Sequence, residues 1–326
     1  LKLVEKEVCI KHKPFVIVIV YQLILWYTEP LQAIANAHHE GYKLGQQLGD
    51  ITYASYNLFF CNQANYVAGQ DLSTIQTNAK DFIQDQLSRK RQDFLAHVGP
   101  VQLYYHVAAL RQGLHVLEAG RVDDVPTIAE VNISDAQSEF ASKIQSLTRA
   151  FLFRQFGGNL IDIMNISDTI KEKKIHLDPV TAVGIFYEGL TCYLCSFEAT
   201  DQVSKATWVG RGQSILAKIR SWHEHSSWNW ENKVLLLEAM EMHTLGNYDA
   251  AEPLYISSIR SAREHKFIHE EAIASELAGD FFYERGSHLE SYALYMHSIK
   301  CFNEWGALAV AKRVESSLQS RFGSEN

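Results

Sequence analysis

Residues 237–259 read LEAMEMHTLGNYDAAEPLYISSI, and residues 277–299 read LAGDFFYERGSHLESYALYMHSI. The two stretches share one pattern at a constant offset, since Gly286 follows Gly246 by 40 residues. A repeat of this length is typical of paired helices that stack on one another. The apolar positions follow a 3.6-residue period rather than alternating, which also indicates helices.

Each part of the repeat has a physical role in the predicted helix pair. A small residue lets the two helices approach closely, and a glycine ends the first helix in a left-handed cap. Asn247 or Ser287 is expected to cap the second helix. A small residue then marks the crossing, and a tyrosine fills the gap between successive pairs. The predicted structural positions are Ala239, Gly246, Tyr248, Ala251 and Tyr255 in one copy and Gly279, Gly286, Ser291 and Tyr295 in the next.

Helix start and stop signals also recur in the rest of the chain. Glu29-Pro30 is expected to open a helix that ends near Gly49, and Asp50 to cap the next one. Ser73 and Gln76 have the spacing of a capping box. The sequence is predicted to begin with an apolar segment at 1–28 that forms a truncated first helix. Helical pairs at 29–117, a loop at 118–132, central helices at 133–222 and repeats at 230–322 are predicted to follow.

Composition places the chain among soluble globular proteins and excludes several functions. Hydrophobic residues make up 47% and charged residues 21%, and the net charge of −8 disfavours nucleic-acid binding, which needs a basic surface. The five cysteines are scattered, which indicates a reducing compartment, so we expect a cytoplasmic protein. Only 6 prolines and 18 glycines interrupt the chain, which favours an all-α fold.

The repeat resembles the tetratricopeptide (TPR) family. The run Gly246-Asn247-Tyr248 with Ala251 and Tyr255 is similar to the turn and second helix of that repeat. The period of 40 exceeds the usual 34, and Leu235 stands where the signature tryptophan is expected. The resemblance implies a divergent TPR-like α-solenoid of stacked antiparallel helix pairs.

A second resemblance covers most of residues 30–322. The runs 267–286 and 292–307, together with 40–57, are similar to the helical region of large multi-domain sensor kinases. In that family a Ser/Thr-kinase-like domain and a predicted P-loop ATPase precede the helical array, and GAF or PAS sensors and often a histidine kinase follow it. The resemblance implies a regulatory connector and carries no catalytic residue over, because those catalytic domains are not in this sequence.

The standard catalytic motifs are absent from the sequence. It has no P-loop, no completed dinucleotide fingerprint, no nucleophile elbow and no kinase signature. Cys192 and Cys195 have ligand or redox spacing, but a second cysteine pair is lacking and the motif lies in an apolar helix. We interpret them as two buried thiols.

Two groups of histidines suggest the main alternative to a binding role, which is a metal-dependent enzyme. His223-Glu224-His225, and His265 with His269 at i, i+4, could supply metal ligands. Neither group has an obvious third ligand nearby, so polar loops between helices are the simpler interpretation. No metal or cofactor is expected, and a helical metal-dependent enzyme remains an alternative.

Trp222, Trp228 and Trp230 cluster between two predicted helices. Aromatic side chains with polar groups are favoured in binding surfaces, so these three form a possible partner surface. Packing between successive helix pairs is the other interpretation.

The most apolar stretch runs from Phe15 to Trp26 and is shorter than a membrane span requires. A buried helix or strand is expected there, with a targeting segment or membrane anchor at 14–27 as the alternative. The chain begins at Leu1, and we expect it to be a piece of a larger protein.

The sequence therefore predicts a non-catalytic scaffold for protein interaction and signal relay. Its partner would be another protein or a neighbouring domain of the same polypeptide, with no nucleic acid and no membrane. A free-standing TPR-like adaptor is the alternative within the same class.

Overall fold

The computed structural model describes residues 7–90, 98–131, 136–156, 160, 164–173 and 177–323. Within these residues the fold is all-α, as predicted, and the β pairing is limited to an isolated bridge between Val122 and Val125. Ser134 and Gln137 also have the spacing of a capping box, but Ser134 lies outside the described residues.

The chain divides into two compact units whose segments alternate along the sequence. Unit 1 comprises residues 1–109, 114–145 and 167–183, and unit 2 comprises 110–113, 146–166 and 184–326. The groove described below lies in unit 1, and the 40-residue repeat lies in unit 2.

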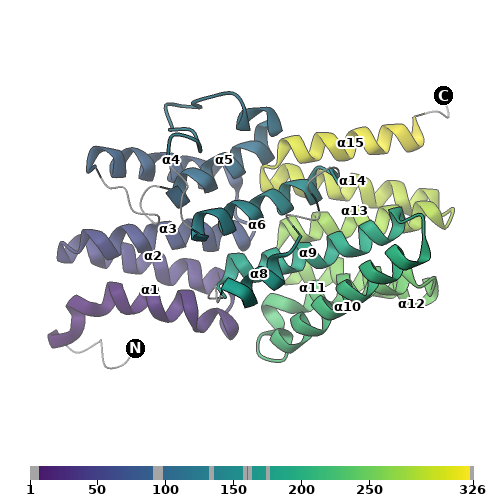
Figure 1. Cartoon of the computed structure of the whole chain (residues 1–326), viewed down its shortest axis with the longest axis horizontal. Coiled ribbons are helices and arrows are strands. Elements are labelled where there is room, and N and C mark those ends of the chain that lie inside the picture. The colour runs from purple at the N-terminus through teal and green to yellow at the C-terminus, as the bar shows by residue number, and fades with distance from the viewer. Residues whose placement is uncertain are drawn as a thin grey trace. The chain divides into compact units, whose positions relative to one another are not determined.

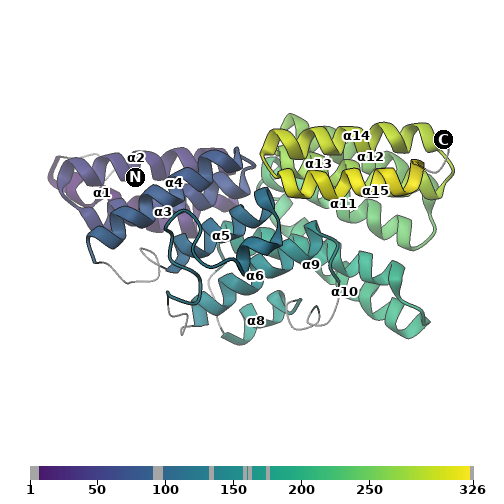
Figure 2. The same ribbon diagram turned by 90° about the horizontal axis from the view of Figure 1, so that it is seen from above.

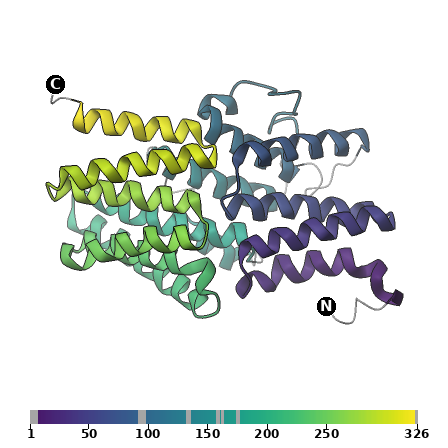
Figure 3. The same ribbon diagram turned by 180° about the vertical axis from the view of Figure 1, so that it is seen from behind.

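Unit 1 begins with four helices that lie side by side, purple to blue in Figure 3. These are α1 (Lys13–Leu23), α2 (Leu31–Leu48), α3 (Ile51–Val67) and α4 (Leu72–Ser88). Two glycines on one face of α2 allow it to approach α3 closely. A Cβ atom at Gly45 would lie 2.9 Å from the Cβ of Ala54, and one at Gly41 would overlap the Asn57 side chain.

The ends of these helices follow the sequence signals with one correction. Gly49 ends α2 with φ of 74°, and the Asp50 side chain accepts a hydrogen bond from the Tyr53 N–H at the start of α3. The predicted capping box at Ser73 is wrong. Asp71 caps α4 instead, because its carboxylate accepts from the Thr74 N–H at 2.8 Å.

The middle of the chain is less regular. The region predicted as helical pairs at 29–117 ends with α5 (Gly99–Gln112) and a 3-10 turn over Leu114–Leu117. Further helices that follow α5 are α6 (Ala136–Leu152), α8 (Ile166–Lys173) and α9 (Pro179–Glu198). The segment between α5 and α6 is held by Tyr105, whose hydroxyl donates to the carbonyls of Gly120 and Val125.

Unit 2 contains consecutive helices that pack in sequence order (Figure 1). They are α10 (Gln202–His223), α11 (Ser227–Thr244), α12 (Tyr248–Glu264), α13 (Ile268–Glu284), α14 (His288–Trp305) and α15 (Leu308–Phe322). Helices α11 and α12 form one pair and α13 and α14 the next, and α12 packs against α13. Figure 2 shows α14 and α15 side by side from above.

The repeat positions occupy equivalent places in the two pairs. Gly246 and Gly286 have φ of 78° and 75°, in the left-handed region that glycine adopts without strain. A Cβ at Gly279 would lie 3.1 Å from the Tyr295 ring, so the missing side chain makes room for that tyrosine. Ala251 and Ser291 are fully buried, and the Ser291 hydroxyl donates to the Gly279 carbonyl at 2.8 Å.

The tyrosines of the repeat differ in their surroundings. Tyr255 and Tyr295 are buried, while Tyr248 is partly exposed, with the guanidinium of Arg285 over its ring. Asn247 and Ser287 stand at the N-cap positions of α12 and α14, but neither side chain makes the cap hydrogen bond that was predicted.

Two apolar helices can be compared with membrane-spanning segments. The predicted apolar segment forms α1, which buries Ile17 and Val18 and leaves Phe15 and Ile19 partly exposed. Helix α9 is long and apolar enough to cross a membrane by length and composition, but 83% of that window is buried. Burial of this extent is typical of a core helix in a globular protein.

Candidate functional site

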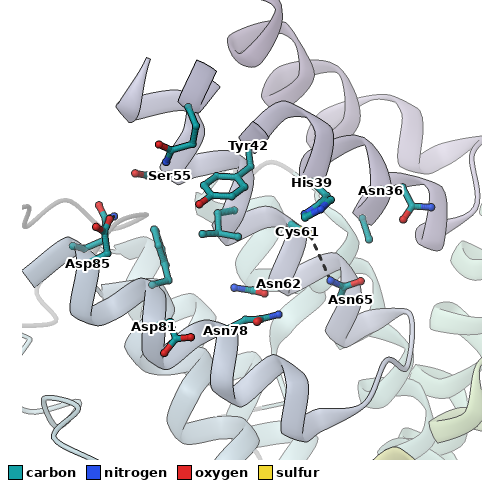
Figure 4. A pocket seen from close by; sticks show the side chains of 15 residues that line it. Asn36, His39, Tyr42, Ser55, Cys61, Asn62, Asn65, Asn78, Asp81 and Asp85 are labelled. Atoms are coloured by element: carbon teal, nitrogen blue, oxygen red, sulfur yellow. Dashed lines mark hydrogen bonds between the residues drawn. The ribbon is translucent and has the colours of Figure 1, made fainter. Parts of the chain in front are cut away.

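A groove of about 580 Å³ lies over α3 in unit 1, with α2 and α4 as its walls. Figure 4 shows the α2 side chains on one side, the α4 side chains on the other and α3 between them. The lining side chains are mostly polar, and they are Asn36, His39, Tyr42 and Gln46 from α2, Ser55, Leu58, Cys61, Asn62 and Asn65 from α3, and Asn78, Asp81, Phe82, Asp85 and Gln86 from α4, with Ala35 at one edge.

Helical periodicity explains how three helices present this set of residues. On α2 the lining residues recur at spacings of three and four, as on one face of a helix. Helix α4 repeats the pattern from Asn78 through Asp81 to Asp85. Buried apolar residues lie on faces turned away from the groove, with Ile34 on α2 and Ile83 on α4. The helices therefore turn one face to the core and a polar face to the groove.

Asn62 is the most informative residue of the groove. Its side chain lies at the floor of the groove and is only 2% exposed. A carboxamide aimed into a groove is satisfied when a ligand supplies a donor and an acceptor.

Gln86 adds a second buried amide. It is 1% exposed and donates to Asp85 at 3.0 Å, while its carbonyl oxygen has no partner among the described residues. Asn65 lies further along the floor, and its amide contacts the Cys61 sulfur at 3.5 Å. Several amides thus face the groove with hydrogen-bonding capacity left over.

The α4 wall makes the groove acidic. The Asp85 carboxylate is bound by the Arg89 guanidinium at 2.8 Å, which neutralises it in part. Asp81 is exposed and has no ion-pair partner in the described regions. His39 is the only basic side chain among the lining residues, so the groove favours a positively charged ligand.

A second cavity of about 310 Å³ lies in unit 2, and most of its charged side chains pair with one another. The Glu276 carboxylate is bound on both oxygens by Arg313, and Arg154 adds a bond of 3.0 Å. Arg321 donates to Asp280 at 2.7 Å, and the Tyr295 hydroxyl bonds to the same carboxylate. This network joins α13 to α15 and has a structural role.

The three tryptophans do not form one exposed patch. Trp222 and Trp230 are buried, and their rings pack 4.9 Å apart between α10 and α11. Trp228 is only partly buried, and its ring lies 4.6 Å from that of His265. The structure therefore favours packing over a partner surface for Trp222 and Trp230.

Packing also accounts for Cys192, Cys195 and His269. Cys192 and Cys195 are free and buried in α9, and burial raises the pKa of the Cys195 thiol to about 11. His269 is buried beside Trp305, and burial lowers its pKa to about 4. Across the described ranges, neither His223 and His225 nor His265 and His269 belong to a group of three possible metal ligands.

One group of possible ligands was missed in the sequence. Glu271, His297 and Cys301 bring three donor atoms within 4.8 Å of one another. The i, i+4 spacing of His297 and Cys301 was a readable signal, but their pairing with Glu271 depends on how α13 packs on α14. The groove was missed for the same reason, because its residues come from three helices whose contacts the sequence does not state.

No protein-family model matches this chain, and no curated protein matches it either. The side chains of the groove therefore carry the functional argument.

Proposed function

We propose that this chain is a non-catalytic protein-interaction segment, built as a TPR-like solenoid, whose groove between α2 and α4 binds an extended peptide with a basic side chain. The peptide would belong to a partner protein or to a neighbouring domain of the same polypeptide. The observation that carries the proposal is the pair of nearly buried carboxamides of Asn62 and Gln86 in the groove, because the Gln86 carbonyl oxygen has no partner among the described residues.

The chemistry of the groove suits a peptide backbone. A carboxamide donates one hydrogen bond and accepts another, which is what an extended backbone offers along its edge. Asn62 on the floor and Asn78 on the wall both line the groove, so such bonds can repeat along it. The lining residues of α3 run from Ser55 to Asn65. This stretch is about 15 Å long at a helical rise of 1.5 Å per residue. That length holds about four or five residues of extended chain.

The charge of the groove suggests which peptides fit. Asp81 has no ion partner among the described residues and can pair with a lysine or arginine of the peptide. Tyr42 offers an aromatic ring on the opposite wall, against which an aliphatic or cationic side chain can pack. An acidic peptide would be repelled by the α4 wall.

The wider role follows from the resemblance noted in the sequence. A helical region that binds peptides could act as the connector of a multi-domain signalling kinase in a reducing, cytoplasmic compartment. A free-standing adaptor would use the same groove. Both roles need the groove and differ only in whether the peptide is part of the same polypeptide.

A selection experiment tests the proposal. The full chain is immobilised and used to select from a random library of displayed dodecapeptides, in parallel with the Asn62→Leu and Asp81→Asn variants. Wild-type protein should enrich peptides that contain lysine or arginine, and both variants should lose that enrichment. No enriched family on the wild type, or the same family on Asn62→Leu, would contradict a peptide-binding groove.

A further inference from the structure

Three metal-ligating side chains converge where α13 packs on α14. His297 and Cys301 follow each other at i, i+4 on α14, and Glu271 faces them from α13. The His297 Nε2 atom lies 2.7 Å from Glu271 Oε1 and 3.4 Å from Cys301 Sγ. Glu271 and Cys301 are buried, while His297 is 29% exposed and opens the cluster to solvent.

We propose that Glu271, His297 and Cys301 form a binding site for a borderline divalent cation of the Zn²⁺ type. A carboxylate oxygen, an imidazole nitrogen and a thiolate are the three ligand types that zinc takes in proteins. This site lies in unit 2 and is independent of the peptide groove in unit 1.

The distances are close to those that a tetrahedral ion requires. Zinc bonds of about 2.0–2.3 Å at tetrahedral angles place the ligand atoms about 3.4–3.6 Å apart. The separation of 3.4 Å between the Cys301 sulfur and the His297 nitrogen already fits. The contact between His297 and Glu271 is shorter at 2.7 Å, so the carboxylate must move by a fraction of an ångström. Three protein ligands leave a fourth position for water.

A cationic side chain already lies against this cluster. Arg263, in the last turn of α12, donates from Nε to Glu271 Oε1 at 2.7 Å, and its Nη2 atom lies 3.1 Å from His297 Nε2. The Arg263 side chain is 60% exposed, so its guanidinium can turn into solvent when an ion arrives. Arg263 is thus a competitor for the site rather than a ligand.

Either tautomer of His297 leaves one of the two contacts of its Nε2 atom without a hydrogen bond. If Nε2 carries the proton, it donates to Glu271 but opposes the donor-only guanidinium of Arg263. If Nε2 is bare, it accepts from Arg263 but faces the carboxylate oxygen at 2.7 Å. A metal ion resolves this conflict, because the nitrogen and the oxygen both donate lone pairs to it.

Cobalt is the probe that reports the thiolate directly. The full chain, with its cysteines reduced by a phosphine, is titrated with Co²⁺. We expect one equivalent to bind and to produce a thiolate-to-cobalt charge-transfer band, which Zn²⁺ then abolishes by displacement. Cys301→Ser should remove the band, and His297→Gln should weaken binding by at least about tenfold.

Two further variants separate an effect on metal binding from an effect on folding. Arg263→Gln removes only the exposed competitor, so it should lower the Kd for Co²⁺ several-fold. His225→Gln, which removes an exposed histidine outside the cluster, should leave the titration unchanged. A wild-type protein without the band, a Cys301→Ser protein that keeps it, or weaker binding by Arg263→Gln would overturn the assignment.

Discussion

The ammonium group of Lys233 and the carboxylate of Glu270 form an ion pair 2.7 Å apart, and both side chains are buried. Lys233 lies on α11 and Glu270 in the first turn of α13, so the pair joins the two helix pairs of the repeat. Asn232 donates to the same carboxylate oxygen, and the Phe267 ring lies 4.3 Å from the ammonium nitrogen. Burial lowers the pKa of Lys233, and the charge of Glu270 opposes that shift.

Removal of one partner should therefore cost far more than removal of both. Lys233→Met leaves the Glu270 carboxylate buried without its counter-charge and should destabilise the protein by about 3–5 kcal/mol. The double variant Lys233→Met with Glu270→Gln removes both charges and keeps an acceptor for Asn232, so it should recover most of that loss. Urea unfolding followed by circular dichroism measures both values. A double variant as unstable as Lys233→Met would show that the pair is not what holds these helices.

Acid should weaken the fold through His38. Its Nδ1–H donates to Asn57 Oδ1 at 2.9 Å, and its buried Nε2 has no partner within the described residues. Burial lowers the pKa of His38 to about 4, while the bond to Asn57 acts in the opposite direction. Between pH 6.5 and 4 the unfolded chain binds this proton and the folded chain does not, so stability falls as the pH falls.

The expected loss from His38 between pH 7 and pH 4.5 is about 2 kcal/mol. His38→Gln keeps a donor for Asn57 but does not titrate, so its stability should depend less on pH over that range. His225→Gln, at an exposed histidine, should keep the wild-type pH dependence. If His38→Gln and the wild type lose equal stability, His38 is not buried in its neutral form.

Glycine substitutions should separate two kinds of glycine in unit 2. A Cβ atom at Gly246 or at Gly210 would meet nothing within 4 Å, so steric overlap does not distinguish them. Gly246 has φ of 78°, and alanine there should cost about 1–2 kcal/mol. Gly210 lies exposed in α10, where alanine should add about 0.5–1 kcal/mol of stability. Thermal melts should therefore shift in opposite directions, and shifts of the same sign would contradict the left-handed cap.

The repeat could be predicted from the sequence because its signals come from residues that are close together in the chain. The positions of Gly246 and Gly286 and the 3.6-residue period do not depend on distant contacts. Asp50 was predicted as a cap for the same reason. Asp71 was missed as the cap of α4, because the capping-box spacing of Ser73 and Gln76 lies within three residues of it and the pattern alone does not place the first helical turn.

The groove could not be predicted because it depends on the placement of three helices. Asn62 reads as an ordinary polar residue in α3, and its burial becomes visible only when α2 and α4 flank it. For Trp222 and Trp230 the sequence left two interpretations open, a partner surface and packing between helix pairs. The two rings pack together in the interior, which favours packing.

Asn62→Leu should stabilise the free protein. Leucine has the same branched shape and no polar atoms, so the substitution removes a carboxamide at a position that is only 2% exposed. The gain should be about 1 kcal/mol or more, measured as a higher midpoint of thermal unfolding. A lower midpoint would show that the carboxamide is already satisfied within the protein, and the groove would lose its main support.

The affinity of a selected basic peptide, measured by fluorescence anisotropy on the full chain, tests the central claim most directly. Asn62→Leu should weaken binding by at least about tenfold, as expected for the loss of buried hydrogen bonds to the peptide. Asp81→Asn should weaken it less and reduce its dependence on salt. Gln47→Leu, at an exposed amide of α2 outside the groove, should leave the Kd unchanged. A Kd that is the same for the wild type and Asn62→Leu would contradict the assignment of the groove as the binding site.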